Sequence, residues 1–105
     1  MVENKKMPRV FVVGNGMTKF YKPSKNKMDY FELSEIAIRR ALRDSGLTFE
    51  QVELAYAGYV YGDSTSGQRA VYTVGQTGIP IINVNNNCAT GSTALYLARN
   101  AVRYG

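Results

Sequence analysis

The sequence predicts an α/β fold in which strands and helices alternate in the order β-α-β-α-β-α. Three observations support this prediction: short apolar runs rich in β-branched residues, helical periodicities between them, and turn-forming residues at the junctions. Because strands that alternate with helices pair in parallel beneath those helices, we expect a parallel sheet with helices on its faces.

Three apolar segments are predicted to be strands. Residues 9–13 form a β-branched run that is expected to be buried and to end in a turn at residues 14–16. Residues 54–61 are rich in Tyr and Val, and their small side chains allow another element to pack closely. Residues 81–84 are expected to form a third, buried strand.

Three further segments have helical signals. The first helix is marked at its start by a capping box, formed by Asp29 and Glu32, and at its end by Gly46. A short helix is predicted over residues 68–76. A longer helix is predicted over residues 89–104, with apolar residues on one face and arginines near its C-terminal end, where the helix dipole favours cations.

Length and composition correspond to one globular domain. The chain has 105 residues and a mass of 11.7 kDa, with 45% apolar and 20% charged residues, which separates it from disordered chains. Its longest apolar run, residues 94–98, is far shorter than the roughly 18 residues that a membrane span requires. We therefore expect no membrane span.

The net charge of +5 is concentrated near the N-terminus, because the seven lysines and arginines of residues 1–27 face one acidic residue there. Residues 28–105 are nearly neutral. Residues 1–8 are predicted to be a flexible basic tail, and residues 9–105 the folded part of the chain. Since no base-reading motif accompanies the positive charge, we expect no nucleic-acid partner.

The absence of histidine and the presence of a single cysteine exclude several kinds of site. A disulfide framework, a zinc cluster and a Ser-His-Asp or Cys-His pair cannot be assembled from this sequence alone. Any nucleophile in the chain must therefore obtain its general base from elsewhere.

Cys88 is the candidate catalytic residue. It follows the predicted strand at residues 81–84 and three consecutive asparagines, and it precedes a helix that begins with small residues. Asparagine tolerates the left-handed conformation that a tight turn requires. Backbone N–H groups and the helix dipole at such a position favour the thiolate, and the same groups can stabilise an oxyanion if a second donor lies nearby. The alternative is that Cys88 is a small buried apolar residue. The pattern alone leaves both open.

Three blocks of sequence carry a resemblance to a known family. They are VFVVGNGMTKF at residues 10–20, GYVYGDST at residues 58–65 and IPIINVNNNCATGSTAL at residues 79–95. In this order they resemble the start of the 3-oxoacyl-CoA thiolases of the sterol carrier protein x type. The resemblance covers nearly all of the chain from about residue 9 onward, and it implies a thiolase-like fold in which residues 9–105 form the first part of the N-terminal half-domain.

The resemblance also implies a chemistry. Cys88 matches the family's nucleophile, which attacks the 3-oxo carbon of a 3-oxoacyl-CoA, releases acetyl-CoA or propanoyl-CoA and passes the acyl group to CoA. The backbone N–H of Cys88 is implied to be an oxyanion donor. The expected substrates are 3-oxoacyl-CoA and CoA, with no further cofactor and no metal. The family's two catalytic histidines and its second cysteine have no counterpart in this sequence, so the chain alone is expected to be inactive.

Two further implications of the resemblance concern assembly and location. The strand that begins at Ile81 and ends at Asn85 is expected to pair across the two-fold axis of a homodimer. The location implied by the resemblance is the peroxisome, where the family acts in the β-oxidation of fatty and branched-chain acyl groups. The sequence itself contains no targeting signal, and without one the expected location is the cytoplasm.

A second hypothesis is not enzymatic. The chain could act as a lipid-binding or lipid-transfer module, or as a partner-binding module that pairs with a full thiolase subunit. Composition does not separate this hypothesis from the enzymatic one. Tyr56, Tyr59 and Tyr61 could likewise line an acyl tunnel or only pack the strand.

Overall fold

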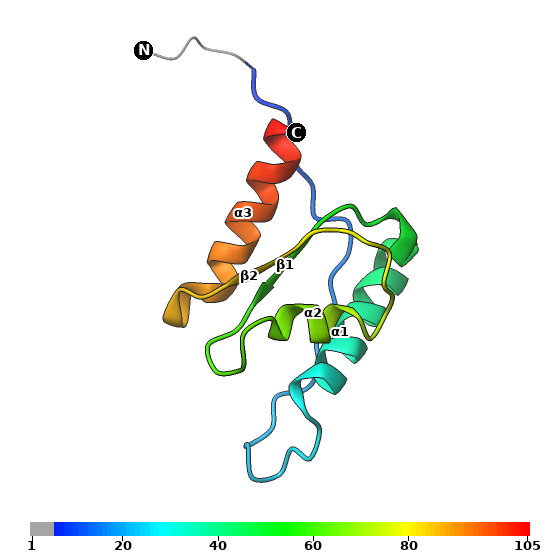
Figure 1. The fold of residues 1–105 in the computed structure, drawn as a ribbon. Helices are drawn as coiled ribbons and strands as arrows, with labels where there is room; N and C mark the ends of the chain where they lie inside the picture. The colour runs from blue at the N-terminus through cyan, green and yellow to red at the C-terminus, as the bar shows by residue number, and fades with distance from the viewer. Residues whose placement is uncertain (1–5) are drawn as a thin grey trace.

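The computed structural model describes residues 6–105 and contains an alternation of helices and strands (Figure 1). The elements are α1 (Tyr30–Ser45), β1 (Ala55–Gly58), α2 (Ser66–Val71), β2 (Ile81–Val84) and α3 (Thr90–Tyr104), with short 3-10 turns at Phe49–Gln51 and Asn87–Ala89. Of the predicted basic tail, residues 1–5 lie outside the described residues. Residues 6–8 are exposed and belong to no helix or strand.

Strands β1 and β2 pair in parallel, as predicted, with Ala55 opposite Ile81. Helices cover both faces of this pair. Ala57 of β1 faces α2, because a Cβ added at Gly67 would lie 2.7 Å from the Ala57 Cβ. The next residue, Gly58, faces α3, where a Cβ would lie 2.6 Å from the methyl carbon of Thr90. Since successive strand residues point to opposite faces, α2 and α3 lie on opposite sides of the sheet.

Helix α1 has the boundaries that its sequence signals predict. The Tyr30 N–H donates to Asp29 Oδ1 at 2.7 Å, and the Asp29 N–H donates to Glu32 Oε2 at 2.6 Å. The second contact is half of a capping box, in which the Asp29 side chain in turn accepts from the backbone of Glu32, so that backbone donors at the start of the helix are satisfied. At the other end, Gly46 takes the left-handed conformation with φ of 73°, and its N–H donates to the last turn.

The buried strand predicted over residues 9–13 is wrong. This segment contains no strand, and the side chains of Phe11, Val12 and Val13 are 64–73% exposed. Figure 1 shows the N-terminal part of the chain as a blue coil rather than an arrow. A β-branched run becomes a strand only when a neighbouring strand completes its hydrogen bonds, and the described residues form a sheet of only β1 and β2.

The turn predicted at residues 14–16 is also wrong, because the glycines serve a close approach to α1. A Cβ at Gly14 would lie 2.7 Å from the Ala41 carbonyl oxygen, and one at Gly16 would collide with the carbonyl of Ala37. The Asn15 N–H donates to Asp44 Oδ2 at 3.0 Å, which holds the coil along the helix.

Two other boundaries differ from the prediction. The strand expected over residues 54–61 is limited to Ala55–Gly58, because its partner β2 ends at Val84. The helix expected over residues 68–76 is α2, which begins two residues earlier and ends five residues earlier, at Val71. Its start is set by the Asp63 carbonyl, which accepts hydrogen bonds from the N–H and the hydroxyl of Ser66.

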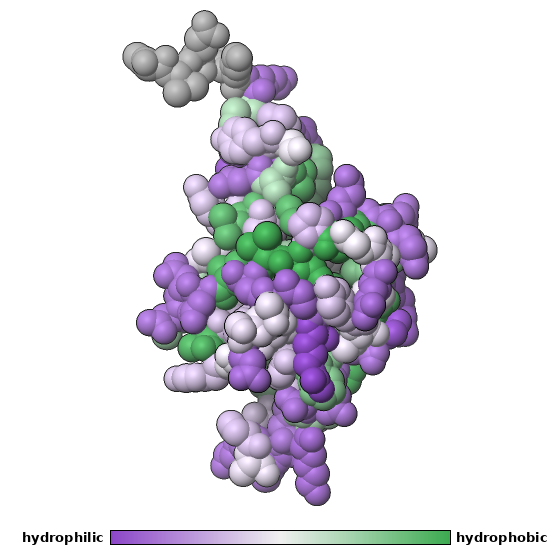
Figure 2. Space-filling model, in the orientation of Figure 1, coloured by the Kyte–Doolittle hydropathy of each residue, from purple (hydrophilic) through white to green (hydrophobic). Residues whose placement is uncertain are grey.

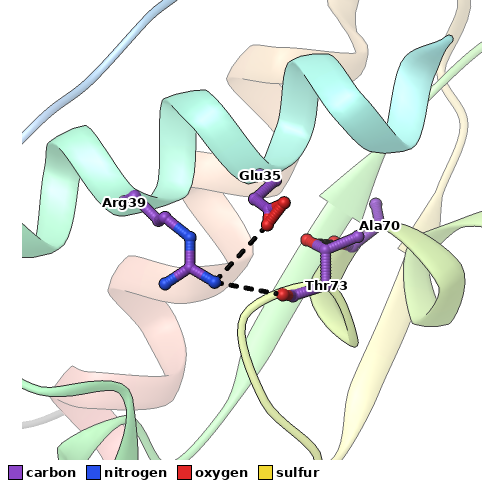
Figure 3. A network of polar contacts seen from close by, with 4 residues as sticks. All are labelled: Glu35, Arg39, Ala70 and Thr73. Carbon is purple, nitrogen blue, oxygen red and sulfur yellow. Dashed lines mark hydrogen bonds and ion pairs between the residues drawn. The ribbon is translucent and has the colours of Figure 1, made fainter.

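A polar network joins α1 to the segment that follows α2 (Figure 3). One guanidinium nitrogen of Arg39 lies 3.4 Å from Glu35 Oε2 and donates to the Thr73 carbonyl at 3.3 Å. The Thr73 hydroxyl donates to the Ala70 carbonyl at 2.7 Å. Because the Arg39–Glu35 pair lies within α1 and is exposed, it contributes at most about 1 kcal/mol. The contact that joins α1 to the segment after α2 is the hydrogen bond from Arg39 to the Thr73 carbonyl.

The apolar core of the described residues is small. It consists of Phe49, Ala70, Val71 and Val84, while many large apolar side chains are exposed. Apolar residues also reach the molecular surface across the middle of the view in Figure 2. A hollow of about 520 Å³ lies between α1, α2 and β1. The secondary structure is thus formed with only part of its apolar surface covered.

An amide network fixes α2 on β2 and leads to a stability prediction. The Gly67 N–H donates to Asn83 Oδ1 at 2.7 Å, and Asn83 Nδ2 donates to Gln68 Oε1 at 2.8 Å. We expect Gly67→Ala to destabilise the protein by about 1–3 kcal/mol, because the added Cβ would overlap both Asn83 and Ala57. Thermal unfolding followed by circular dichroism measures this loss.

Gly91 provides the matched control for that substitution. It also lies near the start of a helix, but a Cβ there meets nothing within 4 Å. Gly91→Ala is therefore expected to be neutral or to stabilise the protein by up to about 1 kcal/mol. Equal unfolding temperatures for the two variants would contradict the proposed packing of α2 on β2.

Candidate functional site

Cys88 lies where the sequence places it, in the turn between β2 and α3. It occupies the 3-10 turn Asn87–Ala89, directly before the first residue of α3, and its side chain is exposed. The alternative that Cys88 is a buried apolar residue is therefore wrong for this structure. Because Cys88 is the only cysteine in the sequence, any thiol chemistry of the chain takes place at this turn.

The residue before Cys88 has an unusual backbone conformation. Asn87 has a φ of 49°, in the left-handed region, and Asn86 has a φ of −144°. Asparagine tolerates the left-handed region better than most residues, as the asparagine tripeptide predicted. The conformation still costs about 1–2 kcal/mol, so neighbouring contacts must offset it.

Thr90 makes the contacts that offset this cost. Its hydroxyl donates to the Asn87 carbonyl at 2.7 Å and accepts a hydrogen bond from the Asn86 N–H at 2.8 Å. Thr90 is only 6% exposed. Each of these hydrogen bonds contributes about 1 kcal/mol, which together is comparable to the cost of the left-handed residue.

A second hydroxyl supports the same turn. Thr93 Oγ1 accepts a hydrogen bond from Asn86 Nδ2 at 2.9 Å and donates to the Ala89 carbonyl at 2.8 Å. Sequence reasoning singled out neither Thr90 nor Thr93. The sequence feature that could have identified them is the presence of two threonines in the first turn of a helix, where hydroxyl groups form hydrogen bonds with the nearby backbone.

Cys88 lies two residues before the first residue of α3. Ala89, the N-cap residue of this helix, makes no side-chain capping hydrogen bond. The first N–H groups of any helix lack partners within the helix and carry the positive end of its dipole. Groups of this kind stabilise negative charge on a thiolate or an oxyanion that lies against them.

The apolar hollow described above is separate from Cys88. Tyr56, Tyr59 and Tyr61 all line it, together with residues of α1 and α2, but Cys88 does not. The hollow therefore offers no path for an acyl chain to the thiol in this structure. Of the three tyrosines, only Tyr56 belongs to β1, and Tyr61 is 95% exposed, so Tyr61 does not pack the strand.

The described residues, 6–105, contain neither a metal-binding cluster nor a helix able to span a membrane. Among residues 6–105, no group of three His, Cys, Asp or Glu side chains is arranged to hold a metal ion. Within the same part of the chain, no helix has the length and apolar character needed to cross a membrane. The chain has no histidine at all, so Cys88 has no imidazole partner here.

Comparison with known proteins gives consistent results. Residues 10–105 match the family described as "Thiolase, N-terminal domain". The chain is 63% identical over 98 residues to Sterol carrier protein 2 of Gallus gallus, and 60% identical over 99 residues to that of Homo sapiens. In both cases the match covers 92% of this chain and only 18% of the relative, so the chain spans less than a fifth of their length.

Two more distant similarities extend this result. The chain is 46% identical to Non-specific lipid-transfer protein-like 2 of Caenorhabditis elegans, a match that covers 93% of the chain and 24% of the relative. Among solved structures, it is similar to 3-oxoacyl-[acyl-carrier-protein] synthase III from Aquifex aeolicus VF5, with a TM-score of 0.58 and 16% identity, over 73% of this chain and 26% of that chain. This structural similarity supports the fold alone.

Proposed function

Because the chain belongs to the thiolase family, we propose that it is the N-terminal, nucleophile-bearing segment of a 3-oxoacyl-CoA thiolase of the sterol carrier protein x type. The observation that carries this proposal is the exposed Cys88 in the turn between β2 and α3. The turn presents a thiol beside the start of a helix, as covalent catalysis by cysteine requires.

In the proposed reaction, the Cys88 thiolate attacks the 3-oxo carbon of the substrate and forms a tetrahedral oxyanion. Collapse of the oxyanion breaks the bond between C2 and C3. The departing carbanion takes up a proton and leaves as acetyl-CoA, or as propanoyl-CoA from a 2-methyl substrate, while the acyl group remains as a thioester on Cys88. The thiol of free CoA then loses its proton, attacks the thioester and restores the Cys88 thiolate.

The chain supplies part of this machinery. We assign the backbone N–H of Cys88 as one oxyanion donor, since it lies in the turn that leads into α3. The second donor and the groups that move protons must come from other segments, because the sequence has no histidine and no second cysteine. The full-length protein, meaning this segment with the remaining thiolase sequence, is the proposed enzyme.

The proposal includes a homodimer and a peroxisomal location. The outer edge of β2 has no strand partner among residues 6–105, which supports pairing of the strand from Ile81 to Asn85 with a second copy. The peroxisomal location rests on the resemblance to the sterol carrier protein x type.

The uncovered surface leads to a prediction for the 105-residue chain. We expect it to elute in size-exclusion chromatography as a dimer or larger species, because its strand edges are open and its apolar residues are exposed. A sharp, concentration-independent monomer peak would contradict the inference that these surfaces require a covering partner.

The direct test of the proposed function is thiolysis by the full-length protein. Acetoacetyl-CoA is incubated with protein and CoA, and the absorbance of the 3-oxoacyl group is followed. We expect loss of absorbance that depends on CoA and yields acetyl-CoA. A stable absorbance with folded protein would reject the enzymatic proposal.

A second candidate function is lipid binding, favoured by the apolar hollow of about 520 Å³ beside β1. Displacement of a fluorescent fatty acid from the 105-residue chain tests it. Saturable displacement at one site, weakened by Ala37→Lys in the lining, would support lipid binding. Partition of the probe without saturation would reject it.

A further inference from the structure

We propose that Thr90 is a positioning residue for Cys88, holding the turn that presents the thiol. This inference rests on the proposed function of Cys88 as nucleophile. Thr90 does not touch the substrate. Its role is to fix the backbone on both sides of Cys88, so that the thiol has one direction of attack.

The Thr90 hydroxyl makes two hydrogen bonds to the backbone before Cys88. It accepts from the N–H of Asn86 and donates to the carbonyl of Asn87, which together bracket the left-handed residue before Cys88. A hydroxyl can do both at once, and no apolar side chain can do either. The two contacts therefore define the backbone conformation from which Cys88 projects.

Thr90 is itself held in place by packing. Its side chain is buried, and its methyl carbon occupies the space that a Cβ at Gly58 of β1 would otherwise fill. Thr90 is also the first residue of α3. Cys88 thus lies between a left-handed residue and an anchored one, with only Ala89 separating it from the anchor.

Three variants of the full-length protein test the proposal. Thr90→Val keeps the methyl group and removes the hydroxyl, and Thr90→Ser keeps the hydroxyl. Thr73→Val is the matched control, because the Thr73 hydroxyl also makes a 2.7 Å bond to a backbone carbonyl, but in the segment after α2. Should T90V fold poorly, T90A replaces it, since alanine removes the same hydroxyl without placing a methyl group beside the Asn86 N–H.

We expect T90V to lower kcat for thiolysis by about 10- to 100-fold with KM changed less than about twofold, since small displacements of a reacting group have effects of this size. T90S is expected to restore most of kcat, and T73V to leave it unchanged. An unchanged kcat in T90V, or equal losses in T90V and T73V, would overturn the positioning role.

Crystal structures of T90V and T90S provide a readout independent of activity. We expect Asn87 to leave the left-handed region in T90V and to remain there in T90S. If Asn87 keeps its conformation in T90V, the positioning role is wrong whatever the activity. If Asn87 moves but Cys88→Ala still turns over substrate at the wild-type rate, the proposed function of Cys88 fails and the control of the turn by Thr90 stands.

Discussion

Replacing Cys88 with alanine is expected to abolish thiolysis by the full-length protein, with kcat falling by at least about a thousandfold, as when a covalent nucleophile is removed from other enzymes. The reason is that no thioester can form without the sulfur. Because Cys88 is exposed, stability should change by less than about 0.5 kcal/mol. Steady-state turnover of acetoacetyl-CoA and CoA measures the first effect, and thermal unfolding the second.

Ser92→Ala is the control for this substitution. Ser92 is a small exposed residue in the first turns of the same helix, and none of the hydrogen bonds that hold the Cys88 turn involves it. Its replacement should leave kcat unchanged. If Cys88→Ala retained a substantial part of the wild-type kcat, the reaction would proceed without Cys88 and the proposed mechanism would be wrong.

The 105-residue chain by itself is expected to show no measurable thiolysis. Cleavage of a carbon–carbon bond by this route needs groups that activate the thiol and return a proton to the leaving carbanion, and the sequence contains no histidine and no second cysteine. The measurement is the 3-oxoacyl absorbance of acetoacetyl-CoA in the presence of CoA, with the full-length protein at equal molar concentration as the control. Robust turnover by the short chain would show that Cys88 needs no partner from later sequence.

The elements that could be predicted are those whose signals lie within the element itself. Helix α1 begins at the capping box of Asp29 and Glu32 and ends at Gly46. Each of these residues makes its hydrogen bonds to neighbours within one helical turn. The strand at residues 81–84 has the bounds that its pattern predicts, but of its four residues only Val84 is buried. Residues 9–13 have an equally strong local pattern, yet a strand depends on hydrogen bonds to a distant segment, which local sequence does not reveal.

The candidate site likewise has one feature that the local sequence predicts and one that it does not. The place of Cys88 follows from the order strand, asparagine tripeptide and helix, which is a local pattern. The role of Thr90 does not, because its two hydrogen bonds depend on the left-handed conformation of Asn87 and on the close packing of α3 against Gly58. Contacts of that kind exist only once β1, β2 and α3 are assembled.

In the proposed mechanism, Cys88 carries the acyl group as a thioester during the reaction. The most direct measurement is rapid acid quenching of the full-length protein with acetoacetyl-CoA in the absence of CoA, followed by proteolysis and mass spectrometry. We predict one acetyl group, located on the peptide that contains Cys88 and lost on addition of CoA. An acetyl group on a different residue, or an unmodified Cys88 in protein that turns over substrate, would contradict the account.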